Sequence, residues 1–137
     1  MAITLSGTEV FLRDLERMIP SDADVDEALT AGAEIIADEM ARNAPVGKTG
    51  RLKNAIKVGK PRTGSRGRYV TAGIHRRDID LSDKGGEYYP AYVEYGHGGP
   101  HPADAHPFIR PAYDLKKDDA WAAVKQATID QMEQKGL

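Results

Sequence analysis

The sequence predicts an α+β fold in one domain, residues 1–137, with a small antiparallel β-sheet packed against helices and residues 1–20 as an N-terminal helical extension. Three observations favour this class. Apolar residues recur at helical spacing in one long segment of the N-terminal half and in another at the C-terminal end. Two short strand-like runs lie between them, and the chain has no internal repeats. We therefore expect one core between helices and sheet.

The first two helices are expected over residues 7–18 and 22–42, because apolar residues recur in both at helical spacing. Pro20 separates them, since proline interrupts a helix. Ser21 or Asp22 can cap the start of the second helix. The N-terminal half therefore contains a short amphipathic helix and a long one.

A hairpin is expected next, with strands at residues 55–58 and 68–74. Residues 59–67 connect them and are rich in Gly, Pro and Arg without apolar anchors. Residues 76–87 form a second polar segment. Both segments are expected to be flexible surface loops, because nothing in them can anchor to a core.

The segment 88–113 holds five of the six tyrosines and five of the eight prolines. Such a segment can bury aromatic surface while proline restricts its backbone, so we expect irregular structure there. A helical pattern then runs from Phe108 to about Gln134, with Pro107 and Pro111 confined to its first turn. This long C-terminal helix completes the order helix, helix, hairpin, irregular segment, helix.

The charges are segregated along the chain. Residues 48–77 contain ten basic and no acidic residues, whereas residues 1–47 contain three basic and ten acidic residues. A block of like charge repels itself unless it is solvated or faces an anion. It is therefore either a solvated hairpin or a surface that faces DNA phosphates or an acidic partner.

The residues offer little for catalysis or metal binding. The chain has no cysteine, which removes thiol catalysis and thiolate metal sites. His97, His101, His106 and Asp104 form the one group with metal-ligand character, but Gly and Pro around them provide no helical register that would aim them together. We predict no metal and no cofactor.

Two further features are candidates for enzyme sites. Residues 47–49 read Gly-Lys-Thr, but a phosphate loop requires glycine where Arg42 stands and a strand in place of the preceding helix. Glu94 lies among aromatic residues and would need a raised pKa to act as a general base. We expect it instead to satisfy backbone groups or to pair with an arginine at a subunit contact. We predict that the protein is not an enzyme and has no small-molecule substrate.

Three motifs occur in order along the chain: Ala-Pro-Val-Gly-Lys-Thr-Gly-Arg-Leu at 44–52, Tyr-Pro-Ala-Tyr-Val-Glu-Tyr-Gly at 89–96 and Ala-His-Pro-Phe-Ile-Arg-Pro-Ala at 105–112. Together they resemble the small neck and tail-completion proteins of long-tailed bacteriophages and prophages. With the flanking helices, the resemblance covers roughly residues 20–135.

The resemblance implies a structural virion protein that assembles as a ring at the head–tail junction, with genomic DNA passing through. It implies contacts with other copies of itself and with head-completion, tail-terminator or tail-tube proteins, assembly in the bacterial cytoplasm and no membrane association. Two alternatives stay open. One is a tail-terminator protein, and the other is a small nucleic-acid-binding module that binds without sequence preference.

Two groups of residues follow as candidate sites. The aromatic segment suits an intersubunit surface, and the loop after the first strand suits diffuse attraction to DNA. The expected interface residues are Tyr89, Tyr92, Glu94, Tyr95 and Phe108. The expected DNA-facing residues are Lys60, Arg62, Arg66 and Arg68.

Overall fold

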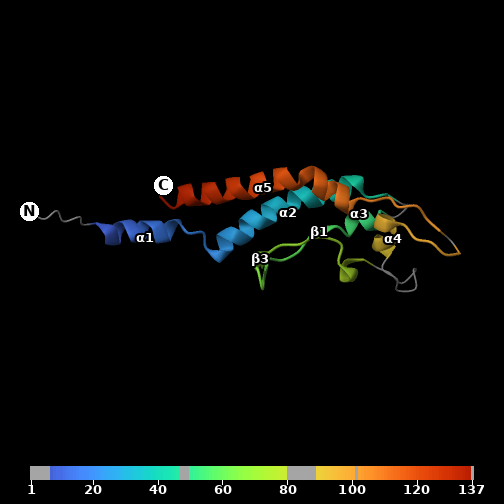
Figure 1. Ribbon diagram of the computed structural model, residues 1–137, viewed down its shortest axis with the longest axis horizontal. Helices are drawn as coiled ribbons and strands as arrows, with labels where there is room; N and C mark the ends of the chain where they lie inside the picture. Colours follow the sequence, from blue (N-terminus) through green and yellow to red (C-terminus); the bar gives the residue numbers. More distant parts are fainter. Residues whose placement is uncertain (1–6, 47–49, 80–88, 101, 137) are drawn as a thin grey trace, which may run out of the picture.

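The computed structural model describes residues 7–46, 50–79, 89–100 and 102–136. Two long helices form the body of an elongated molecule: α2 (Asp22–Asn43) and α5 (Ile109–Gln134) lie side by side (Figure 1). Both helices lie close to their predicted bounds. The predicted α+β class is confirmed, with long helices in the N-terminal half and at the C-terminal end and small antiparallel sheets beside them.

The two long helices approach each other closely at Gly32, which is buried. A Cβ at this position would lie 2.7 Å from Cγ2 of Val124 and 3.0 Å from the carbonyl oxygen of Ala120. Ala28 and Ala120 are also buried in the contact. Small residues therefore allow the two helices to pack at short range.

The N-terminal end of α2 is held by polar contacts. Ser21 and Asp24 form a capping box: the Ser21 N–H donates to Asp24 Oδ2 at 2.9 Å, and the Asp24 N–H donates to Ser21 Oγ at 3.2 Å. Lys135, just after α5, donates to the same Asp24 carboxylate. The Gln131 side-chain amide donates to the Asp24 carbonyl at 3.0 Å. These contacts join the start of α2 to the end of α5.

The strands form two separate antiparallel pairs rather than one long hairpin. β1 (Lys57–Val58) pairs with β4 (Ala72–Gly73), and β2 (Arg62–Gly64) pairs with β3 (Gly67–Tyr69). The predicted antiparallel pairing of the two runs is confirmed at its centre, where Val58 faces Ala72. The fold therefore contains a short inner ladder and a second hairpin at its tip.

Three details of the predicted hairpin were wrong. Ala55 follows the short helix α3 (Arg51–Asn54) and has helical backbone angles, so the strand begins later. Arg68 and Tyr69 pair with residues of β2, not with the first strand. The expected loop 59–67 instead contains β2 and its turn, because Gly67, at φ 109°, adopts the positive angle that a tight turn requires. The mobility of this segment stays a prediction.

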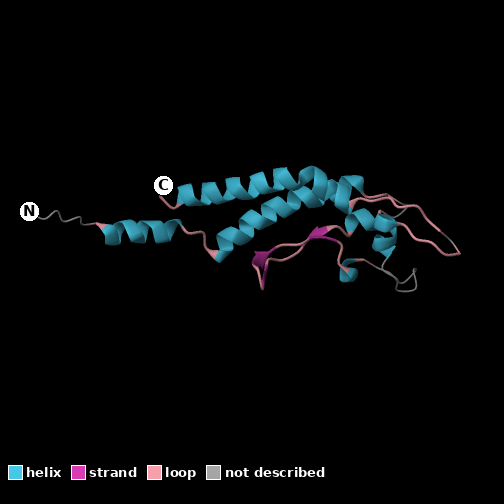
Figure 2. Ribbon diagram, in the orientation of Figure 1, coloured by secondary structure: helices cyan, strands magenta, loops and turns pink. Residues whose placement is uncertain are grey.

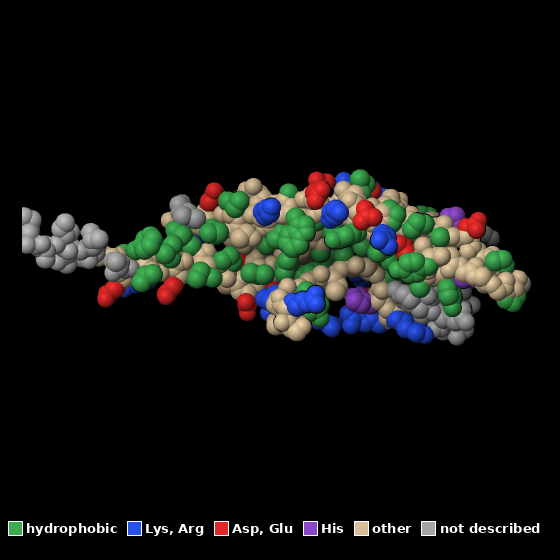
Figure 3. All heavy atoms as spheres, in the orientation of Figure 1, with side chains coloured by type: hydrophobic (Ala, Val, Ile, Leu, Met, Phe, Trp, Pro, Cys, Tyr) green, Lys and Arg blue, Asp and Glu red, His purple; other side chains and the backbone are tan. Residues whose placement is uncertain are grey.

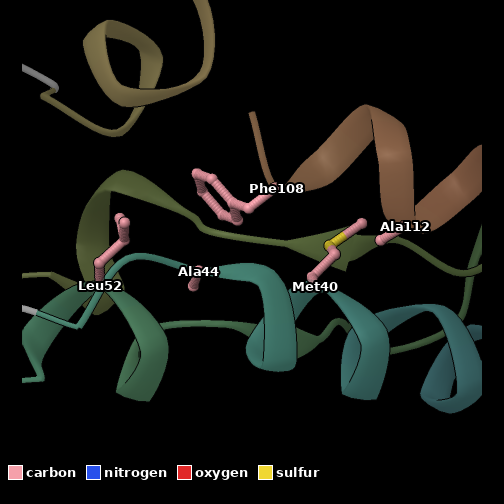
Figure 4. Close-up of a cluster of buried hydrophobic side chains, with 5 residues drawn as sticks. All are labelled: Met40, Ala44, Leu52, Phe108 and Ala112. Carbon is pink, nitrogen blue, oxygen red and sulfur yellow. The ribbon is translucent and has the colours of Figure 1, made fainter. Parts of the chain in front are cut away.

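The main core lies at the end of the helix pair opposite the capping box. Its buried residues come from α2, α3 and the start of α5, and Figure 4 shows the Phe108 ring over Ala44, between Leu52 and Met40. They are Met40, Ala44, Leu52, Phe108 and Ala112. A smaller cluster of Ala55 and Ile79 lies beside the turn η1 (Arg76–Asp78). Most of the second predicted loop, 80–88, lies outside the described residues.

The segment predicted as irregular contains a helix, α4 (Tyr89–Tyr95). The first helix, α1 (Thr8–Met18), matches its prediction and continues beyond the start of α2 rather than folding back along it (Figure 2). Its residues Val10, Phe11, Leu12 and Leu15 are exposed. The amphipathic helix predicted from the sequence therefore exists, but no residue that the structure describes covers its apolar face.

Candidate functional site

Glu94 joins α4 to the start of α5. Its Oε2 accepts hydrogen bonds from the backbone N–H groups of Phe108 at 2.7 Å and Ile109 at 3.0 Å, and its Oε1 accepts one from Arg110 at 3.0 Å. These N–H groups are those that the first turn of a helix leaves without internal acceptors. Glu94 therefore caps α5 across a chain separation of fourteen to sixteen residues.

The electrostatics of Glu94 follow from this geometry. Its burial alone would raise the carboxyl pKa, but three backbone donors and the positive end of the helix outweigh burial, and the pKa is lowered. A general base at neutral pH would need a raised pKa and a lone pair open to substrate. Glu94 is 6% exposed and already accepts three bonds. The expectation that it satisfies backbone groups is confirmed.

The predicted interface residues divide between the surface and the core. Tyr92 and Tyr95 on α4 are exposed, with Tyr95 at 80%. Phe108 is 0% exposed and packs in the main core, so its assignment to an interface was wrong: the ring anchors α5. The side chain of Tyr89 lies outside the described part of the structure.

The histidine-rich loop after α4 is held by backbone contacts. His97 and Ala103 exchange hydrogen bonds of 3.0 Å and 2.9 Å, and the His97 ring lies 5.1 Å from the ring of Tyr92. His101 lies outside the described residues. Within residues that the structure places, no group of three or more His, Asp or Glu side chains is arranged to hold a metal ion.

The basic hairpin presents three of its four predicted residues to solvent. Lys60, Arg62 and Arg66 are exposed. Figure 3 shows Lys and Arg side chains gathered along this edge of the molecule. Lys60, Arg62 and Arg66 are therefore exposed on the hairpin that projects from the helices.

Arg68 has a different role from the one expected. Its guanidinium forms a bidentate pair with Asp26 of α2, with Nη2 2.6 Å from Oδ2, and its Nη1 donates to Thr63 Oγ1 at 2.9 Å. The hydrogen bond with Asp26 raises the pKa of Arg68 further. The side chain is 24% exposed. Arg68 therefore attaches the hairpin to α2. Its guanidinium, which was expected to face DNA, is paired with the Asp26 carboxylate.

An apolar groove of about 430 Å³ runs between α2, α5 and the segment after β3. Its walls include Leu29, Ala33 and Ile36 on one side and Tyr113 and Trp121 on the other. Trp121 is 58% exposed at the rim. Sequence reasoning missed this groove, because a helical pattern shows that a residue is apolar but not whether a neighbouring element covers it.

Comparison with protein families identifies a family to which most of the chain is similar. The family described as "Bacteriophage HK97-gp10, putative tail-component" matches residues 8–96, which include α1, α2, both strand pairs and α4. No curated protein and no solved structure matches. Among the helices placed in the structure, none combines the length and apolar character needed to cross a membrane.

Proposed function

This chain belongs to the HK97-gp10-like family of bacteriophage tail components, and from that premise we propose that it is a neck or tail-completion protein that assembles into a ring at the head–tail junction. The family match over residues 8–96 is the observation that carries the proposal. A tail component is a structural virion protein. The ring, its position and the passage of DNA through it are our inference.

The surfaces of the subunit support a role in assembly. Tyr92 and Tyr95 are exposed on α4, while Glu94 between them fixes α4 against α5. Exposed aromatic side chains on a rigid element are typical of protein interfaces. We assign this face to contacts with a neighbouring subunit or with head-completion, tail-terminator or tail-tube proteins, with assembly in the host cytoplasm.

The basic hairpin supports a role near DNA. Lys60, Arg62 and Arg66 project from a short hairpin that Arg68 attaches to α2. Charges on a projecting hairpin attract phosphates without reading bases, so binding is weak, independent of sequence and steeply dependent on salt. We therefore place this hairpin toward the lumen of the ring, and we place Arg68 in the attachment of the hairpin.

The hairpin also favours the second candidate, a small nucleic-acid-binding module. The two functions differ in what the free subunit does. A module binds DNA measurably at physiological salt, whereas a lumenal surface in a ring acts only when many subunits present their charges together. Titration of labelled duplex DNA with the purified subunit at increasing salt separates them.

The proposal is tested in the phage that encodes the chain, by removing its gene. We expect DNA-filled heads and tails that fail to join, with joining restored by the chain supplied in trans. Complete particles without the chain would reject the junction role. Joined particles with tails of irregular length would favour the tail-terminator alternative.

A matched pair of variants tests the lumenal hairpin. We compare Lys60→Ser, Arg62→Ser and Arg66→Ser combined with a control in which three exposed basic residues elsewhere, Arg13, Arg110 and Lys125, become serine. The hairpin variant is expected to reduce particle yield or packaged DNA, and the control is expected to retain both. Equal yields from the two variants would reject the lumenal position.

A further inference from the structure

Two apolar surfaces of this chain have no partner within the subunit as described. One is the face of α1, where Phe11 is 63% and Ile19 66% exposed. The other is the groove between α2 and α5, with Trp121 exposed at its rim. Apolar surface of this kind costs free energy in water and is typical of contact sites. Each surface is therefore a candidate binding site.

The two surfaces match in form. On α1, residues Phe11, Leu15 and Met18 follow the spacing i, i+4, i+7, which places them on one face, as in helices that bind hydrophobic grooves. The helix has 11 residues and is about 17 Å long. The α2 wall of the groove runs from Leu29 to Met40, which is also about 17 Å of helix.

The charges around the two surfaces are complementary. With 100° between successive residues, Asp14 borders the apolar face of α1 on one side and Glu9 and Glu16 border it on the other. The groove includes Lys117 in its α5 wall and lies beside the basic hairpin. Figure 3 shows Lys and Arg side chains on both sides of the apolar surface in the middle of this face, with Asp and Glu side chains among those on the α5 side. Opposite charges along the borders favour docking of α1 there.

The linker opposes docking of α1 in its own groove. Residues 19–21 separate α1 from α2, and Ile19 is extended at φ −62° and ψ 123° before Pro20. The start of α2 is also covered already, by Lys135 at Asp24 and by Arg68 at Asp26. Folding back over α2 would require reversal at Pro20 and displacement of these contacts.

We propose that α1 of one subunit docks in the α2–α5 groove of a second copy of the chain. Because the helix and the groove are different surfaces, the contact is head-to-tail and repeats from subunit to subunit, which closes a ring when the rotation fits. The inference rests on the self-assembly part of the proposed function. It identifies the contact between neighbouring subunits of the ring.

The absence of cysteine from the chain permits a direct test by disulfide trapping. One full-length variant carries Leu15→Cys, at the centre of the α1 face, and a second, distinguished by a tag, carries Ala33→Cys in the groove wall. The control replaces the first variant with Arg13→Cys, on the opposite side of α1. A disulfide requires Cα atoms within about 7 Å, so only a docked helix forms it efficiently.

We expect the mixed Leu15→Cys and Ala33→Cys pair to form the disulfide at least about ten times faster than the control pair, corresponding to about 1.4 kcal/mol of preference. The rate should rise with protein concentration, and the same bond should form in particles. Equal rates for the two pairs, or no bond in solution and in particles, would overturn the proposal. A third variant carries both cysteines on one chain. A bond that forms within this chain, with none between the separate chains, would show docking in cis and would also overturn the proposal.

A second comparison uses no cysteine. Phe11→Ser with Leu15→Ser is expected to abolish concentration-dependent association in sedimentation velocity, whereas Arg13→Ser with Arg17→Ser is expected to preserve it. If the chain occupies the head–tail junction and Leu15→Cys does not cross-link to Ala33→Cys there, the docking proposal fails alone. If the bond forms in solution but the chain is absent from the junction, the proposed location fails alone.

Discussion

The two ends of the α2–α5 pair are held in different ways. At one end, which we call the core end, Phe108 packs against Met40 and Leu52, and Glu94 caps α5. At the other, which we call the polar end, the partly exposed side chains of Asp24 and Lys135 form an ion pair. α1 extends from the polar end with its apolar face uncovered. We infer that stability is concentrated at the core end, which leaves the other surfaces available for assembly.

The largest expected difference comes from truncating the core ring. Phe108→Ala removes a fully buried side chain and should lower the free energy of unfolding by about 3–5 kcal/mol. Tyr95→Ala, on the exposed face of α4, should change it by less than about 0.5 kcal/mol. Urea unfolding of both variants measures the difference. Similar losses of unfolding free energy in both variants would show that Tyr95 contributes to packing despite its exposed side chain.

Glu94→Gln is expected to have the next largest effect. It removes the negative charge of the carboxylate that accepts three backbone hydrogen bonds at the start of α5. Hydrogen bonds to charged groups contribute about 1.5–3 kcal/mol to the free energy of unfolding. Glu34→Gln, on an exposed part of α2, is the matched control and should be nearly neutral. A loss no larger than that of the control would reject the capping role.

The same variant predicts a pH dependence. Because the folded-state pKa of Glu94 is lowered, its contribution is fully present above the ordinary value of 4.5 and is lost as the pH falls through the folded pKa. The difference in unfolding free energy between wild type and Glu94→Gln should therefore shrink below about pH 4.5. A difference that grows on acidification would contradict the assigned sign.

A smaller effect is expected at the polar end. The hydrogen bond from Lys135, with those from Ser21, lowers the pKa of Asp24 from 3.8 to about 2. Asp24→Asn should therefore lower the melting temperature at pH 7 by less than Glu94→Gln does, and its effect should vanish only as the pH falls from about 4 towards 2. Asp14→Asn is the control, because Asp14 has only a 3.9 Å contact with Arg17 among described residues. A larger drop in melting temperature for Asp24→Asn than for Glu94→Gln would contradict the inference that stability is concentrated at the core end.

The smallest and most local effect is expected in the hairpin. Arg68→Gln breaks the bidentate pair with Asp26 and should speed amide exchange in β2 and β3 while leaving exchange in α5 unchanged. Arg62→Gln, whose side chain is exposed, should leave both unchanged. Equal exchange in the two variants would show that Arg68 does not attach the hairpin.

The long elements could be predicted because their signals are local. The Ser21 cap and the proline-limited start of α5 are visible in a few neighbouring residues. The second hairpin was missed because its strands are polar and only three residues long, so periodicity carries little information there. The helix α4 was missed because its proline-rich surroundings masked a run of only seven residues.

The candidate sites were predicted less well, because pairing and burial depend on contacts far apart in the chain. Arg68 meets Asp26, 42 residues away, and no local pattern distinguishes it from exposed Arg66. Phe108 and Tyr95 lie in one aromatic segment, yet one is buried and the other exposed. Glu94 was interpreted correctly because its aromatic setting and the absence of a catalytic partner both favoured a structural role.

The central claim is that this subunit keeps a stable core end while its other surfaces are covered in the virion. Amide hydrogen exchange of the chain, free and in purified particles, tests it directly. We predict that the core residues around Phe108 are protected in both states, and that the protection of α1, the β2–β3 hairpin and α4 increases in particles. Exchange that is unchanged between the two states, or a chain that is absent from the particles, would contradict the account.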